Sequence, residues 1–213
     1  MIDSIIFDLD GTLWNACSGS VKVWDKVLEK YPFVNKKITK EEMGSCMGLT
    51  IDKVGEKLFP ELDTEMQMKL MKAYCESEVK YLGEVGGTLY PLVEETLEEL
   101  SKEYKLFIVS NCQDGYIQCF FKAHNLEKYF TDFECYGATG LSKGENNILI
   151  IERNNLKNPV YVGDTDGDAE SAIVAKIPFI YASYGFGHVD EKKYNYLLDD
   201  FCNLKRILSN NIE

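Results

Sequence analysis

Short runs of β-branched and aromatic residues alternate along this chain with longer segments whose apolar residues recur every three or four positions. This alternation is typical of α/β proteins, in which helices connect parallel strands. We expect strands at residues 4–7, 106–109, 133–136, 160–162 and 179–182. The pattern therefore predicts a parallel α/β architecture, and ligands bind such sheets at the carboxyl ends of the strands.

One interval breaks this rhythm, because residues 14–86 contain helical patterns and no convincing strand. Two apolar faces lie within it, the first formed by Val21, Trp24, Leu28 and Tyr31, the second by Met68, Met71, Cys75, Val79 and Leu82. A helical insertion here would lie above the carboxyl ends of the strands. We therefore expect residues 14–86 to form a lid, hinged near 13–17 and 84–88, on a core of residues 1–13 and 87–213.

Composition narrows the classes of partner. The chain carries 23 Lys and Arg residues against 35 Asp and Glu residues, a formal net charge of −12. This charge disfavours binding to nucleic acid or to an anionic membrane. A small anionic ligand is still compatible with it, because a bound cation and a few hydrogen-bond donors can invert the field locally.

The cysteines and the N-terminal residues indicate the cellular setting. The seven cysteines are scattered and never form a Cys-x-x-Cys pair, and the chain has only two histidines. These spacings predict free thiols in a reducing compartment and no zinc site. The first residues lack the features of a signal peptide, and no apolar run reaches the length of a membrane span. We expect a cytoplasmic protein that does not bind membranes.

Two carboxylates, Asp8 and Asp10, follow the first expected strand directly. Side chains alternate along extended backbone, so both point the same way. Two carboxylates that lie close raise each other's pKa unless a cation separates them. The segment indicates a metal site, or a nucleophile beside an acid/base, although an ordinary Asp-Gly turn explains it equally well.

A second acidic segment, Gly163–Asp168, follows the strand at 160–162. An N-cap for the next helix is the ordinary explanation of Asp168. The segment superficially matches a calcium-binding EF-hand loop, but Gly167 precedes the third Asp and Ala175 stands where that loop requires Glu. An EF-hand is therefore excluded.

Two further polar positions are weak signals by themselves. Ser110 and Asn111 end the strand at 106–109, where a hydroxyl and a backbone amide can hold a phosphate oxygen or cap the helix after Asp114. Lys143 opens a predicted helix, and a lysine there is usually a surface residue.

In combination these segments resemble the haloacid dehalogenase-like hydrolase superfamily. The resemblance rests on Asp8–Thr12, Ser110-Asn111, Lys143 and Gly163–Asp168, in this order, and it covers nearly the whole chain. The insertion is similar to the cap of the phosphoglycolate phosphatase-like and β-phosphoglucomutase-like branch. One departure is the sequence after Lys143, where Gly-Glu-Asn replaces the more frequent Pro-x-Pro.

The resemblance implies a Rossmann-like, doubly wound sheet with the first strand at its centre, so that all four motifs meet in one crevice. Asp8 would be the nucleophile and would form an aspartyl-phosphate. Asp10 would protonate the leaving oxygen and then activate water. Asp8, the backbone carbonyl of Asp10 and Asp164 would hold Mg²⁺.

The remaining motif residues have implied roles around the phosphoryl group. Ser110, Asn111 and Lys143 would bind its oxygens. Asp168 would orient Lys143 or a metal-bound water, and Gly11 and Thr12 would support the first motif.

These roles imply a Mg²⁺-dependent phosphatase for a small phosphorylated metabolite, such as a phosphoglycolate-like, sugar-phosphate-like or nucleotide-like ester. Asp10 favours phosphoryl transfer, because relatives that cleave carbon–halogen or carbon–phosphorus bonds lack an acid/base Asp there. A sugar phosphomutase is the alternative enzyme, which an arginine-free lid disfavours. A non-catalytic phosphate-binding or regulatory protein is the alternative class, which the intact nucleophile disfavours.

The lid offers candidates for contacts with the leaving group. The loop at 44–49 lies between two predicted helices, and we expect it to reach into the crevice. Cys17 and Met47 are the candidate specificity residues. The expected partner is the small phosphorylated metabolite itself, bound by a monomer or a homodimer.

Overall fold

The apolar run Ile5–Phe7, together with Ser4, forms strand β1 (Ser4–Phe7), whose residues are all buried. A computed structural model, which describes residues 2–211, places β1 third in a sheet of parallel strands. Both faces of such a strand are covered, which explains why its apolar run is continuous rather than alternating. The order across the sheet is β5 (Phe130–Cys135), β4 (Lys105–Ser110), β1, β6 (Pro159–Gly163), β7 (Phe179–Ala182) and β8 (Tyr196–Leu198).

The expected strands agree with this sheet except at its edges. β5 begins three residues earlier than expected, and it ends one residue earlier because Tyr136 begins the short helix α7 (Tyr136–Thr139). β8 was not expected, because it has three residues of which only Leu198 is buried, so it carries no strand pattern. The predicted α/β class and the Rossmann-like parallel sheet are confirmed.

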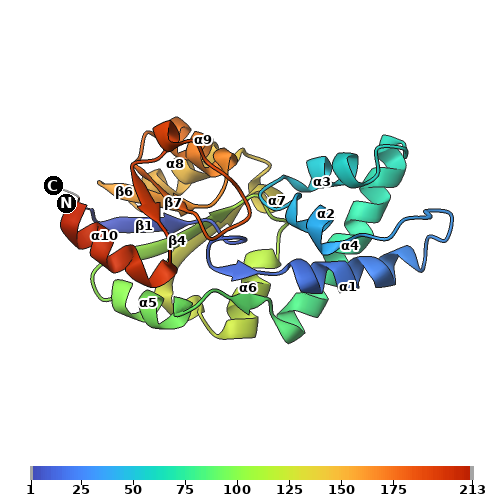
Figure 1. Cartoon of the computed structure of the whole chain (residues 1–213), viewed down its shortest axis with the longest axis horizontal. Coiled ribbons are helices and arrows are strands. Elements are labelled where there is room, and N and C mark those ends of the chain that lie inside the picture. Colours follow the sequence, from blue (N-terminus) through green and yellow to red (C-terminus); the bar gives the residue numbers. More distant parts are fainter. Residues whose placement is uncertain (1, 212–213) are drawn as a thin grey trace.

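Helices cover both faces of the sheet (Figure 1). One face is covered by α5 (Val93–Leu100), α6 (Tyr116–His124) and α10 (Leu204–Asn211), the other by α8 (Lys143–Arg153) and α9 (Asp166–Ala175). Ile5 and Phe7 of β1 pack with the first set of helices, and Ile6 packs with the second. Successive side chains of a strand point to opposite faces, so the sheet is doubly wound. Single-turn 3₁₀ helices at Glu127–Tyr129, Glu191–Lys193 and Phe201–Asn203 lie in the connections.

Residues of the expected lid form a second lobe, at the right of Figure 1. Its helices are α1 (Cys17–Leu28), α2 (Lys40–Gly44), α3 (Ile51–Leu58) and α4 (Thr64–Val85). Trp24 lies in its separate apolar core, stacked on Tyr74 with ring centroids 4.2 Å apart and packed against Phe59 at 5.1 Å. The lobe thus has an apolar core separate from those on the sheet's two faces.

The expected apolar face of α4 is wrong at Met68, whose side chain is 67% exposed. The side of the helix that packs into the lid core runs instead through Leu70, Met71 and Tyr74. The same line continues to Glu78 and Leu82, which are both buried. A carboxylate therefore occupies a buried position of this helix.

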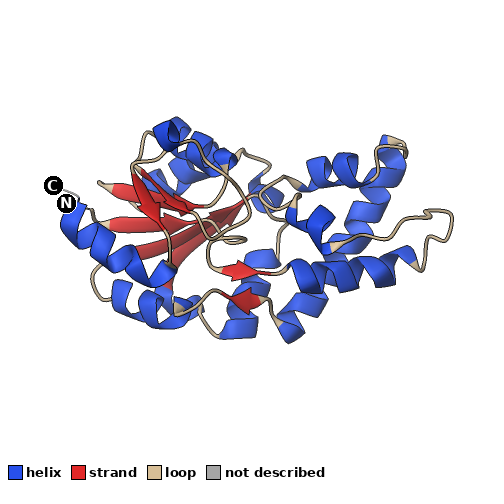
Figure 2. Cartoon of the chain, viewed as in Figure 1, coloured by secondary structure: helices blue, strands red, loops and turns tan. Residues whose placement is uncertain are grey.

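A short antiparallel ribbon connects the lobes (Figure 2). Its strands are β2 (Trp14–Asn15) and β3 (Thr88–Leu89), at the two expected hinges. Trp14 is fully buried, and its ring lies 5.1 Å from that of Phe120 on α6. That this ribbon acts as a hinge stays a prediction. Within residues 2–211, no helix combines the length and apolarity that a membrane crossing requires.

We expect Trp24→Ala to lower the free energy of unfolding by about 3–5 kcal/mol, because it leaves a cavity beneath Tyr74 and Phe59. Urea denaturation measures the loss. Phe33→Ala is the matched control, since Phe33 belongs to the same lobe and is 62% exposed; it should change the stability by no more than about 0.5 kcal/mol. Equal effects of the two substitutions would contradict the packing described.

Candidate active site

The carboxyl ends of three adjacent strands bring the polar motif residues together. Asp8 follows β1, Ser110 ends β4 and Asp164 follows β6. β4 and β6 both pair with β1 in parallel, so these ends lie side by side at one edge of the sheet. All three side chains are buried.

Lys143 joins this group from the first turn of α8. Its Nζ lies 2.9 Å from Asp8 Oδ1 and 2.6 Å from Asp168 Oδ1. Ser142 and Glu145 form a capping box that sets where this helix begins. Burial alone lowers the pKa of Lys143, but the carboxylates of Asp168 and Asp8 outweigh it and raise that pKa above its ordinary value. The lysine therefore stays charged in a buried setting.

Asp168 holds the turn after β6 together. The expectation that it caps α9 is wrong, because the helix begins at Asp166 and Thr165 is its N-cap. Asp168 Oδ2 accepts hydrogen bonds from the backbone N–H of Asp164 at 3.1 Å and from the backbone N–H and hydroxyl of Thr165 at 2.9 and 2.7 Å. One oxygen thus positions the turn that carries Asp164 while the other holds Lys143.

Three carboxylates are close enough to share a cation. One oxygen each from Asp8, Asp164 and Asp168 lie within 4.8 Å of one another. Asp8 Oδ2 and Asp164 Oδ1 are buried and have no hydrogen-bond partner among the described residues. Burial, with the charges of Asp168 and Asp8, raises the pKa of Asp164 well above its ordinary value. Carboxylate oxygens are preferred ligands of Mg²⁺ and Ca²⁺, so the open oxygens of Asp8 and Asp164 fit a divalent cation.

Gly11 and Thr12, which follow Asp8 and Asp10 in the first motif, determine the shape of this corner of the site. Gly11 has a φ of +84°, and a Cβ atom there would lie 2.1 Å from Asp164 Oδ2. Only glycine fits this position, for both reasons. Thr12 is fully buried, and its backbone carbonyl accepts a hydrogen bond from the Tyr184 hydroxyl at 2.9 Å.

Asp10 lies on a cavity that Asp8 and Ser110 also line. Its Oδ1 accepts a hydrogen bond from the Tyr116 hydroxyl at 3.0 Å. Burial and the charges of Asp8 and Glu78 raise the pKa of Asp10 well above its ordinary value. A carboxyl group whose pKa is raised in this way is better suited to act as a general acid. Its carboxylate does not belong to the cation-binding group, in which only its backbone carbonyl was expected.

Asn111 connects the core to the lid. Its Nδ2 donates a hydrogen bond to the backbone carbonyl of Gly48 at 2.9 Å, and its Oδ1 is buried without a partner among the described residues. The side-chain donor that could have held a phosphate oxygen is therefore used by the lid loop.

The two lid candidates lie in different places. Met47 lines the cavity, together with other residues of the 44–49 loop. Cys17 does not; it borders a second cavity with Gly44, Ser45 and Phe186. The first cavity has a volume of about 50 Å³, which is room for about four water molecules.

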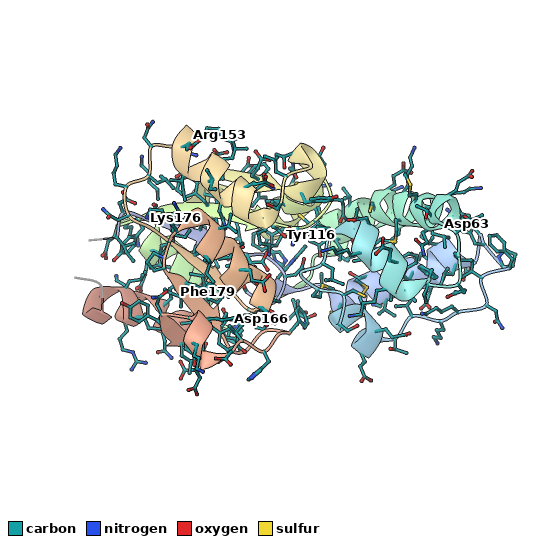
Figure 3. The ribbon with its side chains drawn as sticks, turned by 90° about the horizontal axis from the view of Figure 1, so that it is seen from above. Asp63, Tyr116, Arg153, Asp166, Lys176 and Phe179 are labelled. Carbon is teal, nitrogen blue, oxygen red and sulfur yellow. The ribbon has the colours of Figure 1, made fainter. Side chains whose placement is uncertain are left out.

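The lining residues that sequence patterns did not predict include Tyr74, Glu78, Gln113 and Tyr116. Figure 3 places Tyr116 where the two lobes meet. The signal that could have revealed Glu78 is its spacing. Tyr74 lies three residues and Glu78 seven residues after Met71, so Glu78 falls on the apolar side of the helix that Met71 and Tyr74 share. A charged residue on such a line indicates a function more often than a surface role.

Comparison with known proteins identifies similar chains. The family model described as haloacid dehalogenase-like hydrolase matches residues 5–182. A phosphoglycolate phosphatase from Aquifex aeolicus is 28% identical, over 98% of this chain and 97% of its own length. Another, from Vibrio parahaemolyticus, is 24% identical over 88% and 86%. A crystal structure of a predicted phosphoglycolate phosphatase from Haemophilus somnus has a TM-score of 0.83 at 22% identity, over 97% and 98% of the two chains, which supports the fold.

The pKa of Asp8 predicts how stability depends on pH without divalent cations. Burial raises this pKa from 3.8 to about 6, partly opposed by Lys143. Between these values the folded protein holds the extra proton, so ionisation of Asp8 costs stability as pH rises. Relative to Asp8→Asn, the wild type should lose about 3 kcal/mol of unfolding free energy between about pH 4 and 7.

Urea denaturation with chelator, across this pH range, measures that difference. Asp166→Asn, which removes an exposed carboxylate from the turn after β6, controls for the loss of one negative charge. A difference between wild type and Asp8→Asn that grows in favour of the wild type with rising pH would contradict the assigned burial.

Proposed function

The chain belongs to the haloacid dehalogenase-like hydrolase family, and we propose that it is a Mg²⁺-dependent phosphatase that hydrolyses a small phosphorylated metabolite through a phosphoryl group carried on Asp8. One observation carries the proposal. Asp8 is held by Lys143 on one oxygen and open on the other, and it shares a cavity with Asp10, whose pKa is raised. The names of the phosphoglycolate phosphatase relatives agree with a phosphatase.

The first chemical step transfers the phosphoryl group to the protein. The Asp8 carboxylate attacks phosphorus, and the bond between phosphorus and the leaving oxygen breaks. Asp10 donates its proton to that oxygen, so the product leaves as a neutral alcohol. The hydrogen bond from Tyr116 holds Asp10 Oδ1 and leaves Oδ2 to carry the proton.

The second step removes the phosphoryl group. Asp10, now ionised, accepts a proton from a water molecule whose oxygen attacks phosphorus. The bond between phosphorus and Asp8 breaks, which restores the Asp8 carboxylate and the protonated Asp10 and releases inorganic phosphate. One residue thus serves first as acid and then as base.

The surrounding residues offset the charge that accumulates. In this proposal Lys143, which is paired with Asp168, and the Ser110 hydroxyl, which lines the cavity, bind phosphoryl oxygens. Asp8 and Asp164, with the carbonyl of Asp10, would hold Mg²⁺. When bound there, Mg²⁺ would neutralise part of the negative charge that these carboxylates and the phosphoryl group bring together. We assign this chemistry to the core, residues 1–13 and 87–213, and contact with the leaving group to the lid, residues 14–86.

Hydrolysis of p-nitrophenyl phosphate tests the phosphatase. The wild type should release p-nitrophenol with Mg²⁺ and stop when EDTA is added. Asp8→Asn removes the nucleophile and should lower kcat by a factor of about 10³ or more. Asp166→Asn, an exposed position, serves as the control and should keep the wild-type rate within about twofold. Wild-type turnover by Asp8→Asn would contradict the mechanism.

Thermal unfolding tests the cation site independently of turnover. Mg²⁺ at about 100 times its Kd should stabilise the wild type by about 2.7 kcal/mol, which appears as a higher Tm. Asp164→Asn removes one of the two open oxygens, so most of this shift should disappear. Asp166→Asn should retain it. An equal Mg²⁺ shift in all three proteins would place the cation elsewhere.

A further inference from the structure

The lid side of the cavity carries one charged residue, Glu78. It is 3% exposed and lies among apolar and sulfur-containing side chains of the lid, such as Met43, Met47 and Leu49. Within residues 2–211, the side chains that line this cavity include no Lys, Arg or His. The end of the cavity that faces a leaving group therefore has no cation.

Three hydrogen bonds are donated to the Glu78 carboxylate. Ser20 Oγ donates to Oε1 at 2.6 Å, Tyr74 donates to the same oxygen, and Gln113 Nε2 donates to Oε2 at 2.8 Å. All three neighbours donate to the Glu78 carboxylate, which is the arrangement expected around a hydrogen-bond acceptor. Oε2 receives only one of these bonds, so it can accept another.

Other polar side chains of the cavity also donate hydrogen bonds to groups of the protein. The Tyr116 hydroxyl donates a hydrogen bond to Asp10. The side-chain amide of Gln113 donates to Glu78, and that of Asn111 donates to the backbone carbonyl of Gly48. Asn111 Oδ1, in contrast, is buried and accepts no hydrogen bond within the described part of the chain. This end of the cavity thus offers the acceptors of Glu78 and Asn111, while the amide nitrogens of Gln113 and Asn111 each keep one further, neutral N–H.

Lys143 does not change this balance. Its ammonium group lies between Asp8 and Asp168, at the position assigned to the phosphoryl group. A second anionic group on the substrate would therefore face Glu78 without a cation to balance its charge. Burying a charge in that position costs binding free energy, because the charge loses water and lies close to a carboxylate.

We propose that the leaving group carries a hydrogen-bond donor without negative charge, a hydroxyl or an ammonium group, and that the cavity rejects a carboxylate. The proposal rests on the phosphatase function above and deepens it by naming the substrate class. It separates this chain from the activity in the names of its relatives, since the leaving group of phosphoglycolate bears a carboxylate. Glu78 and Asn111 Oδ1 are the specificity-determining acceptors.

Three two-carbon phosphomonoesters of matched size test this: 2-hydroxyethyl phosphate, O-phosphoethanolamine and 2-phosphoglycolate. They differ only in a hydroxyl, an ammonium or a carboxylate at the end remote from phosphorus. For the wild type, kcat/KM for the hydroxyl or the ammonium ester should exceed that for 2-phosphoglycolate by at least about tenfold. The first two esters also show which donor is preferred.

Calorimetric binding to Asp8→Asn, with Mg²⁺ present, gives the same ranking without turnover. This second measurement separates the two proposals. Loss of all hydrolysis, including that of p-nitrophenyl phosphate, would refute the phosphatase, while the order of the Kd values would still decide the substrate class.

Glu78→Gln tests the residue itself. The substitution keeps the shape and removes the charge, so the preference for the ammonium over the carboxylate ester should fall by about tenfold. Glu76→Gln is the matched control, because it makes the same change on an exposed position of α4 and should leave the preference unchanged. Far-ultraviolet circular dichroism and the Tm verify that both variants fold.

Three results would overturn the proposal. The first is that the wild type hydrolyses 2-phosphoglycolate, or that Asp8→Asn binds it, with the same efficiency or affinity as the other two esters. The second is no detectable binding of any ester. The third is a folded Glu78→Gln variant whose preference for the ammonium over the carboxylate ester is as large as that of the wild type.

Discussion

The contact on which the site depends is the pairing of Lys143 with Asp8 and Asp168. It joins the residue after β1 to the starts of α8 and α9, which are far apart in sequence. Removing three charged groups from water is costly, and only close pairing with further hydrogen bonds compensates for it. Asp168 provides these bonds through its second oxygen, which accepts from the backbone of Asp164 and Thr165. The ionic contact and the turn that presents Asp164 therefore form together.

The charges in this corner do not balance. Asp8, Asp10, Asp164 and Asp168 are buried beside a single ammonium group. The raised pKa values of Asp8, Asp10 and Asp164 follow from burial and from the mutual repulsion of these carboxylates. A site of this kind favours a divalent cation. The different roles proposed for Asp8 and Asp10 agree with their contacts, because among the described residues Asp10 accepts a hydrogen bond from a phenol and Asp8 is paired with Lys143.

The sequence carries enough information for the core of this site and too little for the lid. Asp8, Ser110 and Asp164 were predictable because strand ends of a parallel sheet meet at one edge, whatever the details of packing. Thr and Asp are both common N-cap residues, so the sequence did not decide that Thr165 rather than Asp168 caps α9. The burial of Glu78 and the exposure of Met68 were not predictable. The buried side of α4 is set by the helices that pack against it, and periodicity alone locates that side only to within one or two residues.

The two residues proposed to select the leaving group, Glu78 and Asn111, also hold the lid on the core. Glu78 accepts a hydrogen bond from Gln113, and the carbonyl of Gly48 accepts one from Asn111, so each contact joins a lid residue to a core residue. A cavity with room for about four waters cannot admit a phosphorylated metabolite until the lid shifts, which weakens these contacts. A hydroxyl or ammonium group can then donate a hydrogen bond to Glu78 or to Asn111 Oδ1 as the lid returns, whereas a carboxylate is repelled by the first and has no donor for the second. On this proposal the protein discriminates between leaving groups as the lid closes, when water is excluded from the site. The second phosphate of a bisphosphate, which a mutase reaction requires, would meet the same repulsion from Glu78 as a carboxylate.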